Sequence, residues 1–415
     1  MGNSIPIKHL SCHRKFDPPT DSPDEGNEMT LACVAPDDLS IIIFCRTLCK
    51  MARDEGDIRI VTFGAVGLFE KELADLQSEH VQISMDRFVA PKRDIQYFWQ
   101  LYSRFRRGGF DAVVTFTTKP NIYGVMAAAM ARVPRIALAV RGLGRAFDEP
   151  ESFKDRMLRG LLSVLYKLSC SVCTIAWFTN PNDVSHFISR RIVSPEKVFL
   201  TKNAVDLSVF HPNAVSAGRI DQLRRELGFR EHERIVIMVA RLIWSKGVNE
   251  FIEAAGLLSD RLPDVRFLLV APREGHSHGA IPEDYVRKSE SMRPNFTWLG
   301  FRKDVIDLYA LSELAVLPSY YKEGGYPRAL LEPMAMGKPV IAADTSDCRS
   351  PVEPGKNGYL VPPRDSVALA SAIADIITNE DRRKSFGEYS LKKARAEYDD
   401  KVVVRQVLNR LIFGT

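Results

Sequence analysis

Arg241 and Lys246 stand where two cations can bind a phosphate group. The apolar run at residues 234–240 predicts a buried strand, and Arg241 follows it directly. Lys246 comes just before a helix predicted at residues 248–258. Cations at the carboxyl end of a strand and beside a helix N-terminus suit the charges of a diphosphate. Taken alone, the pair is equally consistent with two solvated charges that flank a turn.

A second polar group follows a later predicted strand. Glu323 precedes Gly324 and Gly325, and the glycines let the backbone pass close to a ligand. Glu332 lies about one turn inside the helix that comes next. Carboxylates so placed can accept hydrogen bonds from sugar and ribose hydroxyls. The alternative is that Glu332 pairs with Arg328 on the surface of that helix.

The motifs around these residues, in their order and spacing, resemble retaining glycosyltransferases of family four, which have the GT-B fold. The motifs that carry the resemblance are Ala240-Arg241-Leu242, Lys246-Gly247, Leu299-Gly300-Phe301, Glu323-Gly324, Leu330-Leu331-Glu332 and Met336-Gly337-Lys338-Pro339.

The resemblance implies a donor site. Arg241 and Lys246 would hold the diphosphate of a nucleotide-sugar, Glu323 the transferred sugar and Glu332 the ribose. The full implied donor set is Arg241, Lys246, Phe301, Gly324, Gly325 and Glu332, with Glu323, Arg241 and Lys246 as the catalytic residues. Such enzymes are thought to retain configuration by front-face attack, in which the leaving diphosphate helps to deprotonate the acceptor. Two fixed cations can neutralise that diphosphate, so we expect no metal and no other cofactor.

The first half resembles the bacterial polysaccharide branch of the same family. The matching motifs are Thr118-Lys119-Pro120-Asn121, Gly142-Leu143-Gly144-Arg145 and Asn180-Pro181-Asn182-Asp183. The resemblance implies acceptor contacts from Lys119, Arg141, Gly142 and Arg145. It also implies a saccharide acceptor linked to a polyprenyl diphosphate.

The chain departs from the family pattern at three places. Eight residues separate Glu323 from Glu332, one more than the family has. Arg141 stands where many members carry histidine, and the glycine-rich turn after the first strand is replaced by residues 35–38, Ala-Pro-Asp-Asp. These departures leave open a catalytically silent GT-B subunit that acts as a binding partner. A second alternative is a GT-B nucleotide-sugar epimerase, which would turn over the donor without an acceptor. A nicotinamide dehydrogenase is disfavoured because no G-x-G-x-x-G follows the first strand.

The elements that position these residues alternate between short β-branched runs and amphipathic stretches, which is typical of an α/β fold with parallel sheets. We predict strands at 31–35, 58–63, 111–116, 135–140, 172–178, 234–240, 265–270, 296–299, 314–318, 339–342 and 359–361. We predict helices at 40–54, 95–107, 122–131, 153–168, 248–258, 305–311 and 328–336. The pattern indicates two doubly wound, Rossmann-like domains that face a central cleft.

Four segments divide the chain in this interpretation. A flexible leader at 1–28 precedes an acceptor-binding domain at 29–210 and a nucleotide-sugar-binding domain at 211–395. The last segment, 396–415, has apolar positions at helical spacing and is predicted to form a helix that packs across the domain boundary.

The helix predicted at residues 153–168 bears on partners. Its apolar stripe is surrounded by cations, with Phe153, Met157, Leu161 and Leu165 on the stripe and Lys154, Arg156, Arg159 and Lys167 around it. Such a helix can rest on anionic lipid, or it can be a core helix with a wet basic face. Resemblance to enzymes of lipid-linked sugars favours membrane contact through Lys154, Arg156 and Arg159.

Composition sets the remaining expectations. A net charge of +5 over 415 residues is too small to indicate nucleic-acid binding. Seven cysteines without a regular framework indicate a reducing compartment. We therefore expect a cytoplasmic protein, and the resemblance to enzymes of lipid-linked sugars implies that it is peripheral on the inner face of the plasma membrane. The pairs Cys170/Cys173 and His276/His278 have no second pair at metal-like spacing, so no metal site is expected.

Overall fold

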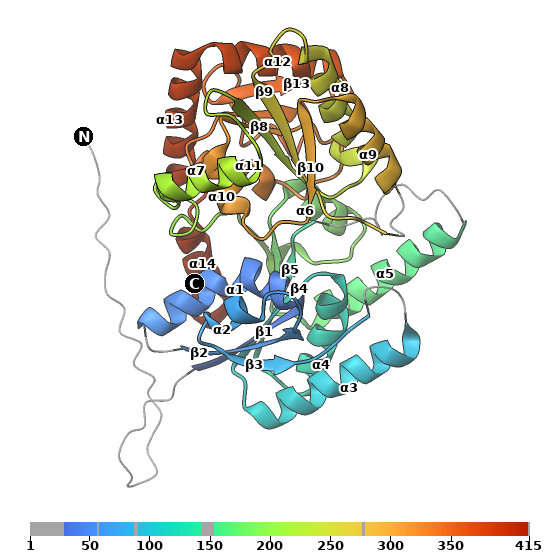
Figure 1. Ribbon diagram of the computed structural model, residues 1–415. Helices are drawn as coiled ribbons and strands as arrows, with labels where there is room; N and C mark the ends of the chain where they lie inside the picture. The colour runs from blue at the N-terminus through green and yellow to red at the C-terminus, as the bar shows by residue number, and fades with distance from the viewer. Residues whose placement is uncertain (1–28, 56–57, 87–89, 143–152, 276–278, 414–415) are drawn as a thin grey trace, which may run out of the picture.

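The computed structural model describes residues 29–55, 58–86, 90–142, 153–275 and 279–413. Arg145, His276 and His278 lie outside these ranges. So does the segment predicted as a leader. Within the ranges the chain forms two α/β domains, one above the other in Figure 1, with an open parallel sheet in each.

The N-terminal domain is built on seven parallel strands in the order β3-β2-β1-β4-β5-β6-β7. Their bounds are β1 (Met29–Asp37), β2 (Ile58–Ala65), β3 (Glu79–Gln82), β4 (Ala112–Phe116), β5 (Arg135–Val140), β6 (Ile175–Phe178) and β7 (Val198–Leu200). The helices are α1 (Asp38–Glu55), α2 (Glu70–Ala74), α3 (Pro91–Gly108), α4 (Val125–Met130), α5 (Phe153–Val172) and α6 (Pro181–Ser189), with a π-helical turn at Pro120–Gly124.

The C-terminal domain has six parallel strands in the order β10-β9-β8-β11-β12-β13. They are β8 (Arg234–Val239), β9 (Val265–Val270), β10 (Phe296–Gly300), β11 (Leu314–Leu317), β12 (Val340–Ala343) and β13 (Gly358–Val361). The helices are α7 (Ala217–Glu226), α8 (Val248–Leu258), α9 (Glu283–Met292), α10 (Val305–Leu311), α11 (Arg328–Ala335), α12 (Ser366–Thr378), α13 (Glu380–Glu397) and α14 (Asp400–Leu408).

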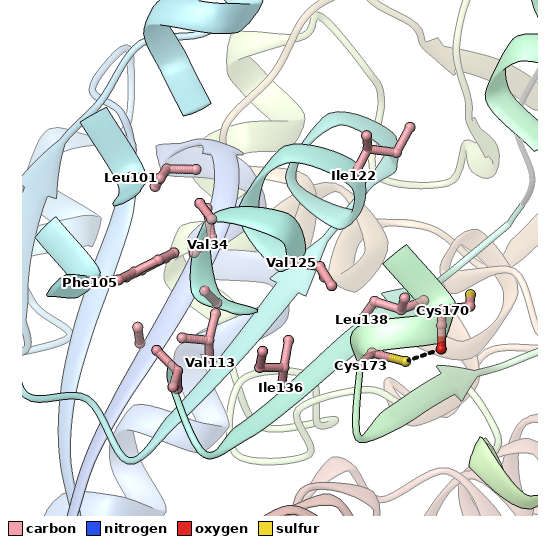
Figure 2. Packing of buried hydrophobic residues seen from close by; sticks show 14 of the residues in the cluster. Val34, Leu101, Phe105, Val113, Ile122, Val125, Ile136, Leu138, Cys170 and Cys173 are labelled. Carbon is pink, nitrogen blue, oxygen red and sulfur yellow. Dashed lines mark hydrogen bonds between the residues drawn. The ribbon is translucent and has the colours of Figure 1, made fainter. Parts of the chain in front are cut away.

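Helices cover both faces of each sheet, so the central strands are apolar on both sides. In β4, Val113 belongs to the core beneath α3, α4 and α5, while Val114 belongs to the core on the opposite face. This alternation follows from the two-residue period of a strand. Figure 2 shows the first of these cores, where Leu101 and Phe105 from α3 lie with Val125 from α4.

The observed boundary between α5 and β6 differs from the predicted one. The predicted strand at 172–178 begins only at Ile175, because α5 continues to Val172. The backbone N–H of Cys173 still donates to the carbonyl of Ser169 at 2.9 Å. Cys170 and Cys173 are both buried in the core, and the Cys173 thiol lies 3.4 Å from the Cys170 carbonyl oxygen (Figure 2). The two cysteines therefore contribute to the packing of the N-terminal core.

The chain returns to the N-terminal domain at its end. Helix α14 follows α13 of the C-terminal domain and places Val403, Val404 and Leu408 in the N-terminal core beside α1. The last strand-like contact before it joins Val205 to Asp399. The two domains are therefore tied by a packed helix as well as by the segment between β7 and β8.

Candidate active site

The carboxyl edges of the two sheets face each other. Gly142 follows β5 and Gly324 follows β11, and a Cβ atom built on Gly324 would lie 2.7 Å from the Gly142 Cα. The amide of Asn180, just after β6, donates to Oδ1 of Asp347, which follows β12, at 3.3 Å. Loops after parallel strands form the ligand sites of doubly wound folds, so we expect the active site at these facing edges.

The loop between β8 and α8 brings Lys246 to Glu323. Gly247 adopts a φ of 79°, and a Cβ atom there would lie 2.2 Å from the carbonyl oxygen of Pro318, so only glycine fits. With the loop held this close to the end of β11, Lys246 Nζ donates to Glu323 Oε2, and Ser319 Oγ donates to Oε1. Both charged side chains are about nine-tenths buried.

Tyr321 connects the two predicted phosphate-binding cations. The guanidinium carbon of Arg241 lies 5.0 Å from the centre of the Tyr321 ring, and Lys246 Nζ lies 4.9 Å from it. Such cation–π contacts hold positive groups over an aromatic face. The structure therefore brings Arg241 and Lys246 together over one aromatic side chain that was not predicted to take part, and Lys246 also contacts Glu323.

Helix α8 begins directly after this loop. Its N-cap is Gly247, and none of the side chains that the structure describes caps its first turn. The N–H groups of that turn and the cations of Arg241 and Lys246 supply positive charge here, while Glu250 in the same turn and Glu323, which pairs with Lys246, supply negative charge. The arrangement can bind a diphosphate and neutralise the charge that develops when the diphosphate leaves.

Glu332 has a different partner. Arg328 Nε donates to Glu332 Oε1 at 3.0 Å, and another nitrogen of Arg328 reaches the carbonyl of Ile43 in α1 at 3.4 Å. Burial raises the pKa of Glu332, and the charge of Arg328 opposes that shift. The i,i+4 pair considered from the sequence exists, but it is mostly buried and helps to join the domains. The ribose contact of Glu332 stays a prediction.

Phe301 and Gly325 also lie where the domains meet. The Phe301 ring, 45% exposed, packs edge-on against Phe69 of the N-terminal domain at 6.1 Å between centroids. Gly325 has a φ of 75°, and a Cβ atom there would lie 3.0 Å from the Thr179 carbonyl oxygen. A larger side chain at Gly325 would therefore disturb this contact between the domains.

The acceptor-side residues are held by protein partners. Lys119 Nζ donates to Asp94 Oδ1 at 2.5 Å, and both side chains are largely buried. The guanidinium of Arg141 lies over the rings of Phe44 and Trp177, at 5.0 and 5.2 Å. Burial lowers the pKa of Arg141 to about 10. Acceptor contacts from Lys119, Arg141 and Gly142 stay predictions, and Arg145 lies outside the described residues.

The predicted membrane-contact residues lie along α5. Arg156 is exposed and Arg159 is partly exposed, while the side chain of Lys154 lies outside what the structure describes. In the described part of the chain no helix is both long and apolar enough to cross a bilayer. The described residues also contain no group of three or more His, Cys, Asp or Glu side chains arranged to hold a metal ion.

Comparison with known proteins identifies the class. Residues 219–393 match the family model described as glycosyl transferases group 1. The chain is 27% identical over 331 residues to a Campylobacter jejuni protein named N,N'-diacetylbacillosaminyl-diphospho-undecaprenol alpha-1,3-N-acetylgalactosaminyltransferase, covering 80% of this chain and 83% of that one. It is 26% identical over 292 residues to the Escherichia coli UDP-Gal:alpha-D-GlcNAc-diphosphoundecaprenol alpha-1,3-galactosyltransferase, covering 70% and 72%.

The fold agrees with this class. Anabaena HepE, solved in complex with UDP-glucose, superposes with a TM-score of 0.74 at 20% identity, over 93% of this chain and all of that one. Together with the family model and the two transferases, this defines the chain as a glycosyltransferase with the GT-B fold. Its C-terminal domain, where the family model matches, carries Arg241, Lys246 and Glu323.

Proposed function

We propose that this enzyme transfers a sugar from a nucleotide-diphosphate sugar to a saccharide linked to a polyprenyl diphosphate, in bacterial surface polysaccharide synthesis. The observation that carries the proposal is that Arg241 and Lys246 lie over the ring of Tyr321 and that Lys246 also pairs with the carboxylate of Glu323. The two transferase relatives, whose names specify undecaprenyl-diphosphate-linked acceptors, support the acceptor class.

The proposed mechanism uses these residues in separate roles. Arg241 and Lys246 hold the donor diphosphate and neutralise its charge as the sugar leaves. Glu323 accepts hydrogen bonds from hydroxyls of the transferred sugar. The leaving diphosphate takes the proton of the attacking hydroxyl, and the anomeric configuration is retained. No divalent metal is required in this scheme, because two fixed cations already face the diphosphate.

We further propose that the enzyme works on the inner face of the plasma membrane, with α5 against the lipid surface. The side chains on the outer face of α5 are apolar yet 47–68% exposed, namely Phe153, Met157, Leu161, Val164, Leu168 and Val172. Leu165, expected on this stripe, instead packs inward. A continuous exposed apolar face on a surface helix is typical of an interfacial segment.

Helix α3 also carries exposed apolar side chains. Helix α4 contacts both α3 and α5, and all three cover one face of the sheet (Figure 1). On α3, Ile95 and Trp99 are more than half exposed. Exposed cations, including Arg104 and Arg156, lie on these helices. Apolar side chains with cations nearby fit an anionic bilayer, and a membrane surface also places the enzyme next to a lipid-linked acceptor.

A transfer assay tests the function. The purified chain is incubated with UDP-, GDP- and ADP-sugars and with polyprenyl-diphosphate-linked N-acetylglucosamine or diacetylbacillosamine, and products are followed by mass spectrometry. We expect one donor to give an acceptor extended by one sugar. Donor binding without transfer to any acceptor would contradict the proposal and favour the silent subunit. Conversion of the donor to its epimer without an acceptor would favour the epimerase.

A further inference from the structure

Asp38 holds a loop of the N-terminal domain in place. It is the first residue of α1, in the segment 35–38 that replaces the glycine-rich turn of the family, and it is only 3% exposed. Its Oδ2 atom accepts hydrogen bonds from the backbone N–H groups of Gly67 at 2.7 Å and Phe69 at 2.8 Å. Hydrogen bonds to a charged acceptor are stronger than neutral ones. The loop between β2 and α2, residues 66–69, is therefore anchored by one carboxylate.

The anchored loop contacts the C-terminal domain. The Phe69 ring packs edge-on against Phe301, which directly follows β10. Lys303 reaches the same loop, because its Nζ lies 4.5 Å from the centre of the Phe69 ring and donates to the carbonyl of Leu68. The same Nζ lies 3.6 Å from Glu72 Oε1 in α2. The loop after β2 and the loop after β10 thus meet across the facing edges of the two sheets.

The strand order places this contact beyond the proposed diphosphate site. Glu323 lies in the loop after β11 and Arg241 in the loop after β8, and β9 and β10 come next in the same sheet. Neighbouring strands are about 4.8 Å apart, so the end of β10 lies about 10 Å further along the edge than the end of β8. A donor with its sugar at Glu323 and its diphosphate at Arg241 therefore extends its nucleoside toward Phe301 and the loop 66–69.

The carboxylate of Asp38 also changes what the start of α1 can bind. A glycine-rich turn at a helix N-terminus presents free N–H groups to an anion. Here the first turn of α1 carries Asp38, whose negative charge opposes an anionic ligand at that end. The junction of β1 and α1 is therefore suited to anchoring a loop and not to binding phosphate.

We propose that Asp38 is a positioning residue for the nucleotide donor, and that the loop 66–69 which it anchors closes the nucleoside end of the donor site. The inference rests on the proposed function, since it takes the donor to be a nucleotide-diphosphate sugar. Phe69 and Phe301 supply an aromatic wall beside the base, and Lys303 keeps the two loops together while the nucleotide is bound. Release of the nucleotide then requires the loop and Lys303 to separate.

The test measures the nucleoside and the diphosphate separately. Calorimetry gives the Kd for inorganic diphosphate and for UDP or GDP, whichever the parent binds better, and stopped-flow displacement gives the dissociation rate of that nucleotide. Asp38→Ala frees the loop, Phe69→Ala removes the ring, and Lys303→Ala removes the contact from the other domain. Asp37→Ala is the matched control, because Asp37 is exposed and its carboxylate accepts from the N–H of Ser40 in α1 at 2.8 Å instead of anchoring the loop.

We expect each of the three variants to weaken nucleotide binding by between about threefold and about tenfold, with a matching increase in the dissociation rate, because one contact that closes the nucleoside end is lost. The Kd for inorganic diphosphate should not change, since this ligand has no nucleoside. Asp37→Ala should bind both ligands like the parent.

Nucleotide affinity and dissociation rate that are the same in Phe69→Ala, Lys303→Ala and the parent would overturn the proposal, even where Asp38→Ala fails to fold. An equal loss of affinity for inorganic diphosphate in these variants would also overturn it, because the loop would then support the whole site. A parent enzyme that binds inorganic diphosphate but neither UDP nor GDP would instead contradict the proposed function, and this inference with it.

Discussion

At the scale of single residues, the pairing of Lys246 with Glu323 has a consequence that can be measured. A diphosphate bound by Lys246 has to share this cation with a carboxylate and also meets the negative charge of that carboxylate. Glu323→Gln removes the charge, so the affinity for UDP or GDP should rise by about fivefold, or about 1 kcal/mol. Sugar transfer should fall, because a contact to the transferred sugar is weakened.

Titration calorimetry measures the nucleotide affinity, which should rise, and the transfer assay measures turnover, which should fall. Glu388→Gln, an exposed position on α13, is the control and should alter neither quantity. If Glu323→Gln bound the nucleotide more weakly than the parent does, Glu323 would support the diphosphate site in some way that the pairing with Lys246 does not describe.

The same two cations predict that turnover is independent of divalent metal. Arg241 and Lys246 lie over one ring. In the proposed mechanism both face the diphosphate and meet the charge of the leaving group without a metal ion. Activity should therefore persist at its full rate in EDTA. Loss of turnover on chelation, with recovery on adding magnesium or manganese, would show that the mechanism needs a metal.

Much of this residue-level picture can be predicted from the sequence, because strand ends, glycines and charges are local patterns. Lys246 and Glu323 were selected from separate motifs, and the fold places them in contact. Tyr321 and Asp347 were missed. An aromatic residue two positions before Glu323 was a signal, since it could stack on the predicted cations. No pattern in the sequence pointed to Asp347, because its contacts to Gly324 and Asn180 join segments that are distant in the chain.

At the scale of elements, the apolar side chains of α5 support the proposed membrane contact more than its cations do. Lys154, Arg156 and Arg159 were predicted from the sequence to contact lipid, and the structure adds an exposed apolar face along the whole of α5. Leu161→Glu and Val164→Glu should each lower binding to vesicles of phosphatidylglycerol and phosphatidylethanolamine by more than about tenfold, because each replaces a group whose burial contributes about 1.5–3 kcal/mol.

The salt dependence of vesicle binding separates the contribution of the cations from that of the apolar side chains. The pair Arg156→Gln and Arg159→Gln should weaken binding at low salt, where each cation adds roughly 1 kcal/mol, and much less at high salt. Val367→Glu is the control: Val367 is 63% exposed, against 55% for Leu161 and 57% for Val164, but it lies on α12 of the C-terminal domain, so the variant should bind like the parent. Vesicle flotation that is equal for Leu161→Glu, Val164→Glu and the parent would leave α5 without a lipid contact.

The sequence predicted some helices and strands and missed others, and each outcome has a physical reason. Central strands such as β5 were predicted at their observed bounds, because burial on both faces requires an apolar run. The edge strand β3 was missed, since Glu79–Gln82 is polar and is defined by backbone pairing with β2. Helix α13 was also missed, because its sequence is dominated by charge and it buries only a narrow stripe.

At the scale of the whole molecule, α14 binds the end of the chain to the N-terminal core. Leu408 is 2% exposed in that core, whereas Val402 on the same helix is 55% exposed. Leu408→Ala should therefore lower the free energy of unfolding by about 2–5 kcal/mol, as for other buried leucines. Val402→Ala should change it by less than about 0.5 kcal/mol. Urea denaturation that gave equal values for both variants would mean that α14 does not stabilise the N-terminal domain.

The central claim is that the β8–α8 loop binds the donor diphosphate, and titration calorimetry with UDP and GDP tests it most directly. Arg241→Ala and Lys246→Ala should each lose about 1.5–3 kcal/mol of binding free energy with the better nucleotide, since each removes a charge-assisted contact. Lys384→Ala, an exposed lysine on α13, should bind as tightly as the parent. Unchanged nucleotide affinity in both Arg241→Ala and Lys246→Ala would contradict the account, because the donor would then be held somewhere else.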